Sequence, residues 1–547
     1  MATRTRKSTF VFVLFLELVV GAVIWFSSSP SGAQPPPPPT VAQATTDTAP
    51  TVDAPPPPPA IMPAASACPK KPPPPKKALI DDLLPIGILI VVITVVVMRL
   101  PRVELGHSTA FRHRRLLNWL PLGLTYSFLY FGRYNMKQFQ GIGLTELEYG
   151  TVFGVGSAVY GIAFLLNGPL TDRWGGRQTI LISAAGSGVA NALMGYMALS
   201  GETFGMSHVT AFSAAYALNM YFQSFGAVSI VKVNAAWFHV RERGTFGGIF
   251  GILISLGLYF AYDVGRRITE YFEIEWLFFI PAIVLAIFFV LSFLFVQNQP
   301  SDAGHPDFDL GDGLQSDEKL GVVKVFVKLL THPVILTISI IELCSGFLRQ
   351  AILQWGVDFG KGVGLGNTFV FENWGMVSCI AGITGGIFAG AISDHMFQSR
   401  RSPVSGVLYG VMLGGAILIV PLFVVPQAIG WVVAFMSMAI IGVHGMLTAT
   451  ASADFAGKRN TGVAVGIIDG FVYLGSTAQS FLYGAMLPAS KIRDAATGCL
   501  VKNPEAAKID NWTIWPYAMI PVALVGFLLT LRIWNAKPKR TGDPGGH

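Results

Sequence analysis

Runs of about twenty apolar residues recur along this chain of 547 residues and restrict it to one class of fold. An apolar helix of ~20 residues is long enough to cross the hydrocarbon core of a bilayer. The composition agrees, because 52% of the residues are hydrophobic and only 13% are charged, and a soluble protein carries about twice that charged fraction. The sequence therefore predicts an all-α, polytopic membrane protein with the lipid bilayer as its surroundings.

We place fourteen candidate membrane spans in the sequence. Two lie upstream, near Phe10–Phe26 and Leu83–Met98. Twelve follow, near residues 117–138, 151–170, 179–199, 209–231, 245–263, 275–296, 333–356, 373–393, 404–424, 430–452, 461–486 and 513–531.

The twelve later spans form two repeats of six. The repeat is marked by pairs of similar residues at nearly one offset: Arg133 and Arg349 (216 residues), Arg243 and Arg459 (216), and Asp172 and Asp394 (222). Parallel repeats of six helices imply a binding site between the two halves, near the midplane of the membrane.

The chain divides into seven segments by composition. They are an N-terminal segment (1–34), a Pro-rich extracytoplasmic linker (35–78), an extra transmembrane helix (79–100), a first bundle (112–296), an inter-bundle loop (297–328), a second bundle (329–535) and a tail (536–547). The first segment is either a signal anchor or a signal peptide cleaved near Ala33. The linker is either a spacer or a docking segment for a periplasmic or membrane partner, since proline blocks cannot form a packed core.

Lysine and arginine in the short loops predict that both termini are cytoplasmic. We expect a multi-pass protein of a bacterial inner (plasma) membrane. The net charge of +7 reflects this topology and needs no nucleic-acid partner. The four cysteines show no metal-binding spacing. Cys68 and Cys499 both fall outside the membrane in this topology, and a disulfide between them is one interpretation.

Arg133 and Arg349 lie inside apolar spans, where a charge is unfavourable by about 2.5–3.5 kcal/mol on insertion scales. A guanidinium group stays charged, and its forked donors fit phosphate or carboxylate. Two such groups at matching positions of the two halves predict a clamp for a small anion. The alternative is a buried carboxylate partner, but Glu342, the best candidate, precedes Arg349 by two helical turns.

Three further ionisable groups within the spans are candidates for coupling or charge balance: Glu342, Asp469 and His444. Glu342 either carries a coupling proton or balances one arginine. Asp469 either lines the site or caps a neighbouring helix, and His444 is either a packing hydrogen-bonder or a proton group. The sequence has no Walker loop, catalytic triad or metal-ligand cluster, so we expect no cofactor and no enzymatic activity.

The segment Gly168–Arg177 resembles the signature loop between helices 2 and 3 of the major facilitator superfamily, and Gly390–Arg401 is similar to its counterpart in the second half. The resemblance implies a twelve-helix fold, here with about two extra N-terminal helices. It also implies gating roles for six residues: Asp172, Arg173, Arg177, Asp394, Arg400 and Arg401.

Residues 115–535 more narrowly resemble the organophosphate:phosphate antiporters, the glycerol-3-phosphate and hexose-phosphate carriers. The motifs are Tyr-Phe-Gly-Arg-Tyr-Asn-Met, Trp-Phe-His-Val-Arg-Glu-Arg-Gly, Gly-Phe-Leu-Arg-Gln-Ala-Ile-Leu-Gln-Trp and Gly-Phe-Val-Tyr-Leu-Gly-Ser. The resemblance implies that Arg133 and Arg349 grip a phosphate. Tyr130, Asn135 and Tyr473 match polar positions near that site.

Two positions depart from the family pattern. Family members commonly carry a lysine in helix 2 and a histidine in helix 5, where this chain has Phe164 and Ile254. The resemblance implies a monomeric carrier that exchanges a small organic phosphate for inorganic phosphate. Two alternatives stay open, a proton-coupled carrier of another organic anion and a sugar-phosphate sensor that does not transport.

Overall fold

The computed structural model describes residues 79–99, 105–239, 242–310, 322–397, 401–447, 461–494 and 498–535. The chain separates into a small unit, residues 1–72 with Asp494–Cys499, and a large unit, Pro73–Arg493 with Leu500–His547. The predicted span Phe10–Phe26, the Pro-rich linker and the tail 536–547 lie outside the described residues. All that follows concerns the large unit unless stated.

The first half of the large unit is helical and follows one extra helix, α2 (Leu79–Arg99). Its elements are α3 (Thr109–Tyr134), α4 (Met136–Phe139), α5 (Glu146–Trp174), α6 (Gly176–Ser200), α7 (His208–Trp237), α8 (Arg243–Tyr259), the π-turn η2 (Phe260–Val264), α9 (Gly265–Tyr271), α10 (Trp276–Phe295) and the 3₁₀ turn η3 (Ser301–Ala303).

The second half repeats this pattern after a short helix, α11 (Val322–Leu330). Its helices are α12 (Pro333–Leu353), α13 (Trp355–Gly362), α14 (Phe369–Glu372), α15 (Trp374–Met396), α16 (Arg401–Ile419), α17 (Ile429–His444), α19 (Thr461–Met486) and α20 (Ile514–Arg532). Short 3₁₀ turns join some of them: η4 (Pro421–Val424), η5 (Pro426–Ala428), η7 (Pro504–Ala507) and η8 (Ile509–Trp512). The strands β1 (Lys491–Arg493) and β2 (Leu500–Lys502) pair antiparallel between α19 and α20, with Ile492 opposite Val501.

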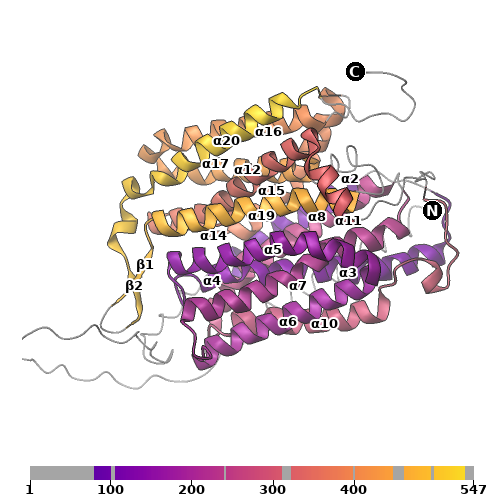
Figure 1. Cartoon of the computed structure of the whole chain (residues 1–547). Helices are drawn as coiled ribbons and strands as arrows, with labels where there is room; N and C mark the ends of the chain where they lie inside the picture. Colours follow the sequence, from indigo (N-terminus) through magenta and orange to yellow (C-terminus); the bar gives the residue numbers. More distant parts are fainter. Residues whose placement is uncertain are drawn as a thin grey trace, which may run out of the picture. The chain divides into compact units, whose positions relative to one another are not determined.

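Equivalent helices make equivalent contacts in the two halves. In the first half α3 packs on α8, α5 and α6 pack on α7, and α6 packs on α10. In the second half α12 packs on α19, α15 and α16 pack on α17, and α16 packs on α20. The halves meet through α5 with α19 and α8 with α15, which are also an equivalent pair (Figure 1). This packing confirms the predicted all-α fold of two six-helix repeats.

Glycines allow the closest helix crossings. A Cβ atom on Gly346 of α12 would lie 1.8 Å from the carbonyl oxygen of Val472 in α19. A Cβ atom on Gly257 of α8 would lie 2.5 Å from the carbonyl oxygen of Ser127 in α3. Small residues therefore bring the backbones together in both halves, as is usual between membrane helices.

Length and composition alone qualify seven segments of the described chain as membrane spans. They are Glu146–Trp174, Gly176–Ser200, Trp276–Phe295, Pro333–Gly362, Ser402–Ile419, Pro426–Leu447 and Ile509–Arg532. Two further apolar helices, Leu84–Met98 and Trp374–Ala389, are shorter. The helix α7 buries polar side chains such as Asn219 and Gln223 against its neighbours. Those side chains face protein and not lipid.

Two helices are interrupted near the same end of the bundle, and both interruptions place polar residues between the halves. The helix α3 ends at Tyr134, and the chain continues past Asn135 as α4. The helix α8 passes into the π-turn η2 before α9. Short π-turns inside helices are often found at functional positions.

Two of the four cysteines, Cys344 and Cys379, are free and buried, as expected of small apolar fillers. Cys499, in the small unit, is disulfide-bonded. Cys68 lies outside the described residues, so its pairing with Cys499, one interpretation of the sequence, is not tested.

Candidate anion-binding site

Arg133 is fully buried in the last turn of α3. Its Nε donates a hydrogen bond to Oε1 of Gln223 in α7 (2.8 Å), and its Nη1 donates to the hydroxyl of Tyr473 in α19 (2.6 Å). Nη2 has no hydrogen-bond partner among the described residues. Arg133 of the first half therefore donates a hydrogen bond to the second half, and its Nη2 remains able to donate to a ligand.

Arg349 occupies the equivalent position in α12 and is 7% exposed. Its Nε has no hydrogen-bond partner within the described chain. The guanidinium carbon of Arg349 and that of Arg133 each lie 5.8 Å from the centre of the Tyr473 ring. A single tyrosine ring is thus in contact distance of both arginines, and it brings the two predicted clamp residues into one site.

Aromatic rings surround Arg133. The guanidinium carbon lies 4.6 Å from the ring centre of Tyr130 and 4.3 Å from that of Tyr160. Phe164, where the family pattern has a lysine, packs edge-on against Tyr160 with ring centres 4.8 Å apart. Such rings attract a cation through their faces without neutralising its charge. The site is therefore a cationic seat in an aromatic cage.

No carboxylate forms an ion pair with Arg133 or Arg349 in the part of the chain that the structure describes. Glu342 is fully buried, and its Oε2 lies 3.2 Å from Nδ1 of His444 in α17. Asp469 is also buried, one turn before Tyr473 in α19. Buried charges are usually paired, so two arginines without a carboxylate partner indicate a site that receives an anion from outside the chain.

The amide of Asn135, a residue also expected near the anion, is engaged within the first half. Its Nδ2 donates to Oδ1 of Asn191 and to the carbonyl oxygen of Leu277, both at 3.0 Å and both in the first half. This amide connects the end of α3 to α6 and α10, and a role for Asn135 at the anion stays a prediction. The rings of Tyr130 and Tyr473 contact Arg133, and that of Tyr473 also contacts Arg349, while their roles at the anion stay predictions.

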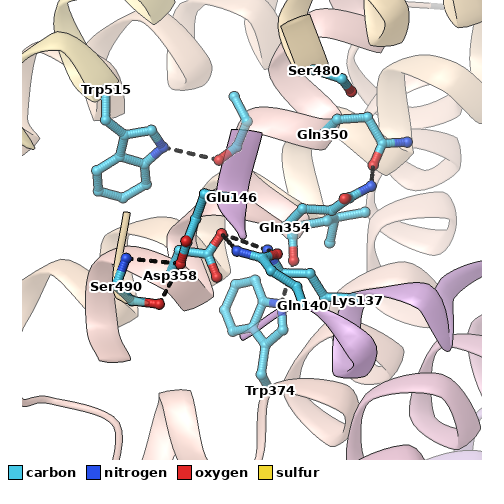
Figure 2. A network of polar contacts seen from close by, with 12 residues as sticks. Lys137, Gln140, Glu146, Gln350, Gln354, Asp358, Trp374, Ser480, Ser490 and Trp515 are labelled. Carbon is cyan, nitrogen blue, oxygen red and sulfur yellow. Dashed lines mark hydrogen bonds and ion pairs between the residues drawn. The ribbon is translucent and has the colours of Figure 1, made fainter. Parts of the chain in front are cut away.

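Sequence reasoning missed a second polar cluster between the halves (Figure 2). Nζ of Lys137 in α4 lies 2.5 Å from Oδ2 of Asp358 in α13, and Nε2 of Gln140 donates to the same oxygen (3.1 Å). Lys137 lies at the very end of the predicted span 117–138 and Asp358 just beyond the span 333–356, so each looks like an ordinary charge at the end of a helix. Opposite charges following the two repeat-equivalent helices were the available signal.

The predicted gate loop is held within the first half. Oδ1 of Asp172 lies 2.6 Å from Nζ of Lys232 in α7, and both side chains are largely exposed. Nη2 of Arg177 donates to the carbonyl oxygen of Phe293, and Arg173 is exposed. In the second half, Asp394 lies on α15 and Arg401 begins α16. Their side chains and all of Arg400 lie outside the described residues.

Residues 122–479 match the model of the Major Facilitator Superfamily. The chain belongs to this superfamily. It is therefore a multi-pass membrane protein of a transporter family rather than of an enzyme family, which agrees with the aromatic and cationic seat between two repeats.

Two curated relatives show what kind of member it resembles. The chain is 26% identical over 395 residues to a glycerol-3-phosphate transporter of Bacillus subtilis. The alignment covers 68% of this chain and 85% of that protein. It is 24% identical over 423 residues to the membrane sensor protein UhpC of Salmonella typhimurium, covering 73% and 85%.

Solved structures agree on the fold. A bacterial homologue of the human lysosomal transporter Spinster aligns with a TM-score of 0.58 and 13% identity, over 79% of this chain and 99% of the other. At that identity the likeness concerns the arrangement of helices alone.

Proposed function

We propose that this chain carries a small organic phosphate of the glycerol-3-phosphate or sugar-phosphate type across the membrane, in exchange for inorganic phosphate. One observation carries the proposal. Arg133 and Arg349, at equivalent positions of the two halves, lie on one tyrosine ring and have no carboxylate partner in the described chain. The name of one curated relative, a glycerol-3-phosphate transporter, supports the same substrate class.

A phosphate group suits this seat physically. Its charge offsets the repulsion between the two guanidinium groups, and its oxygens accept from donors that have no partner, Nη2 of Arg133 and Nε of Arg349. Each charge-assisted hydrogen bond contributes about 1.5–3 kcal/mol. Because the two arginines belong to different halves, the anion gains most contacts when the halves close around it. Differential contacts of this kind shift a conformational equilibrium.

Exchange follows from the same electrostatics. Without an anion, both arginines are enclosed without a counter-charge while the carrier passes between its outward-open and inward-open states. Enclosing unneutralised charges in a low-dielectric interior is unfavourable. A bound phosphate removes that barrier in either direction. The carrier then returns rapidly only with another phosphate compound in the seat.

One chain supplies both halves of the site, so a monomer suffices for this mechanism. We place the protein in a bacterial inner membrane with both termini cytoplasmic, as the loop charges indicate. In this orientation the end of the bundle that carries Gln140 and Asp358, here called the outer end, faces the outside of the membrane.

The test is counterflow of labelled phosphate into proteoliposomes preloaded with phosphate, glycerol-3-phosphate or glucose-6-phosphate. We expect rapid exchange in the parent protein and none in Arg133→Ala or Arg349→Ala. The trans compound that drives the fastest uptake identifies the cargo. Absence of exchange with all three compounds, in protein shown to be folded, would overturn the proposal.

The contact between Glu342 and His444 favours a second candidate, a proton-coupled carrier of an organic anion. Glu342 is buried, its Oε1 has no hydrogen-bond partner among the described residues, and His444 is partly exposed. A proton bound by Glu342 and His444 would be transported together with the anion, which Arg349 binds two helical turns from Glu342. Uptake driven by an imposed pH gradient, lost in Glu342→Gln while phosphate counterflow persists, would favour this candidate.

The relative named as a membrane sensor supports a third reading, in which the seat binds its ligand but the protein does not transport. Binding of glucose-6-phosphate with negligible flux in the same vesicles would establish it. Exchange at rates typical of a carrier would exclude it.

A further inference from the structure

The outer end of the bundle is bridged by a buried ion pair between the halves, Lys137 with Asp358. Their side chains are 1% and 5% exposed. Nζ of Lys137 also donates to Oε1 of Gln140 (2.6 Å) and lies 4.7 Å and 5.1 Å from the ring centres of Tyr149 and Trp355. Removing one member of such a pair leaves an unpaired buried charge, which is strongly unfavourable.

Indole groups hold the second-half side of this pair in place. The helix α12 ends at Leu353, where carbonyl groups lose their helical partners. The carbonyl of Leu353 accepts from Nε1 of Trp374 (2.8 Å), and that of Ala351 accepts from Nε1 of Trp515 (2.9 Å) (Figure 2). The start of α13, which carries Asp358, is thereby fixed against α15 and α20.

A second bridge joins α5 to the segment after α19. Glu146, fully buried at the start of α5, accepts from the backbone N–H of Ser490 (2.8 Å) and from its hydroxyl. Two residues further along α5, Glu148 pairs with Arg493 (3.0 Å), and Nζ of Lys491 donates to the carbonyl of Gly141 (2.6 Å). The first turn of α5 and β1 are therefore connected by several polar contacts.

A third bridge joins η2 to α15. The buried carboxylate of Asp263 accepts from the backbone N–H groups of Gly375 (2.9 Å) and Met376 (2.8 Å), in the first turn of α15. These N–H groups have no partner within the helix, and a carboxylate at this end is favoured by the helix dipole. Asp263 and Glu146 both use a buried carboxylate to hold backbone N–H groups of the other half. They do so in the two equivalent helix pairs, α8 with α15 and α5 with α19.

A layer of amides lies between the ion pair and the arginine seat. Gln350 and Tyr134 directly follow Arg349 and Arg133, and Nε2 of Gln350 donates to the Tyr134 hydroxyl (3.2 Å). Nε2 of Gln354 donates to Oε1 of Gln350 (2.6 Å). One hydrogen bond between the halves, from Gln350 to Tyr134, thus lies next to the seat, and Gln354 extends this polar layer within the second half.

From these contacts we infer that Lys137–Asp358, Glu146–Ser490 and Asp263 with the first turn of α15 form one outer gate. The three bridges break together when the seat opens to the outside. Lys137–Asp358 is its charged centre, and the two carboxylate–backbone bridges flank it in the equivalent helix pairs. The inference rests on the alternating-access part of the proposed function and not on the identity of the substrate.

The test measures access from outside to a cysteine placed behind the gate. Ser480, buried in α19 between Tyr473 and Ser490 in the sequence, allows the conservative change Ser480→Cys. A membrane-impermeant maleimide is applied to the outer face of vesicles of known sidedness. Labelling of the parent chain without Ser480→Cys gives the background.

We expect Lys137→Gln, Asp358→Asn and Asp263→Asn each to raise the labelling rate at position 480 about tenfold or more, because each leaves a buried group unpaired in the closed gate. The exchange of charges, Lys137→Asp with Asp358→Lys, should return labelling towards the parent rate. Lys508→Gln is the matched control, since it breaks the exposed pair of Lys508 with Glu505, which lies within the second half.

Parent-like labelling in all three single variants, or an equal increase in Lys508→Gln, would overturn the gate. Folding is checked by monodispersity in detergent, and the charge exchange shows that an increase reflects the pair rather than general damage. The labelling needs no phosphate compound. Failure of counterflow with intact gating would therefore reject the substrate proposal alone.

Discussion

The arginine seat and the outer gate are both buried, charged and built from the two halves, but they handle charge in opposite ways. Arg133 and Arg349 have no carboxylate partner in the described chain, whereas Lys137 has Asp358 at 2.5 Å. A buried charge without a partner is stabilised when a ligand of opposite charge binds. A buried ion pair between the halves is instead stabilised as long as the gate stays closed. The comparison teaches that binding and gating can be told apart by whether the protein supplies its own counter-charge.

The largest expected effect comes from removing an arginine. In Arg133→Gln or Arg349→Gln, initial rates of phosphate counterflow should fall by at least about 100-fold, because two hydrogen bonds to a charged group, about 1.5–3 kcal/mol each, are lost. Arg349→Lys should also fail to restore the rate, since lysine lacks the forked donors. Thermal unfolding of these variants should occur no lower than in the parent. A rate like that of the parent in either glutamine variant would remove the arginines from the seat.

For the gate pair, Lys137 with Asp358, we expect the opposite pattern, in which a substitution lowers the stability of the fold. Lys137→Gln leaves Asp358 buried and unpaired, so we expect a loss of about 3–5 kcal/mol in the free energy of unfolding. Lys137→Met combined with Asp358→Leu removes both charges and should unfold within about 1 kcal/mol of the parent, since apolar replacement of a buried pair is often neutral. Denaturant unfolding in detergent measures both. Equal losses in the single and double variants would mean that packing, and not charge, holds the gate.

Tyr473→Phe sharpens the comparison within the seat. It removes the hydroxyl that accepts from Nη1 of Arg133 at 2.6 Å and keeps the ring that both arginines contact. We expect a loss of about tenfold in counterflow, the equivalent of one hydrogen bond of ~1.4 kcal/mol, and thus far less than for either arginine. Tyr130→Phe is measured beside it, because the ring of Tyr130 also contacts Arg133 and its hydroxyl is a predicted polar group of the site. A loss as large as that of Arg133→Gln would make the hydroxyl itself a principal ligand.

The smallest effect is expected at the exposed pair of Asp172 with Lys232, which lies within one half. Asp172→Asn should change the free energy of unfolding by no more than about 1 kcal/mol, because solvent screens an exposed pair. The measurement is the same denaturant unfolding as for the gate pair. A loss comparable with Lys137→Gln would contradict the distinction between buried and exposed pairs.

The two positions that define the seat could be found in the sequence because each is a charge inside an apolar run. Their common offset of 216 residues then placed them in equivalent helices. Asn135 looked equally suitable, but its amide turns towards Asn191 in the first half. A motif specifies which residues are near one another along a helix, whereas the direction of a side chain depends on how that helix packs.

The gate could not be found in the same way. Lys137 and Asp358 lie 221 residues apart, one at the end of the predicted span 117–138 and the other just beyond 333–356, and Asp263 contacts α15, which lies more than a hundred residues later. Each is an ordinary loop or helix-end charge in the sequence. Their pairing follows from two helix interruptions, that of α3 at Asn135 and that of α8 at η2. At these interruptions the ends of both helices turn towards the other half.

The sequence by itself determined a helical membrane protein of two repeats with an arginine in each, because hydrophobic runs and charges within them are properties of a single helix in a bilayer. Only the tertiary structure decided which charges have partners. Glu342 contacts His444 and not Arg349, and Lys137 contacts Asp358. The physical reason is that pairing requires two side chains from distant helices to meet within a few ångströms. Helix crossings set by glycine contacts and helix interruptions decide where that occurs.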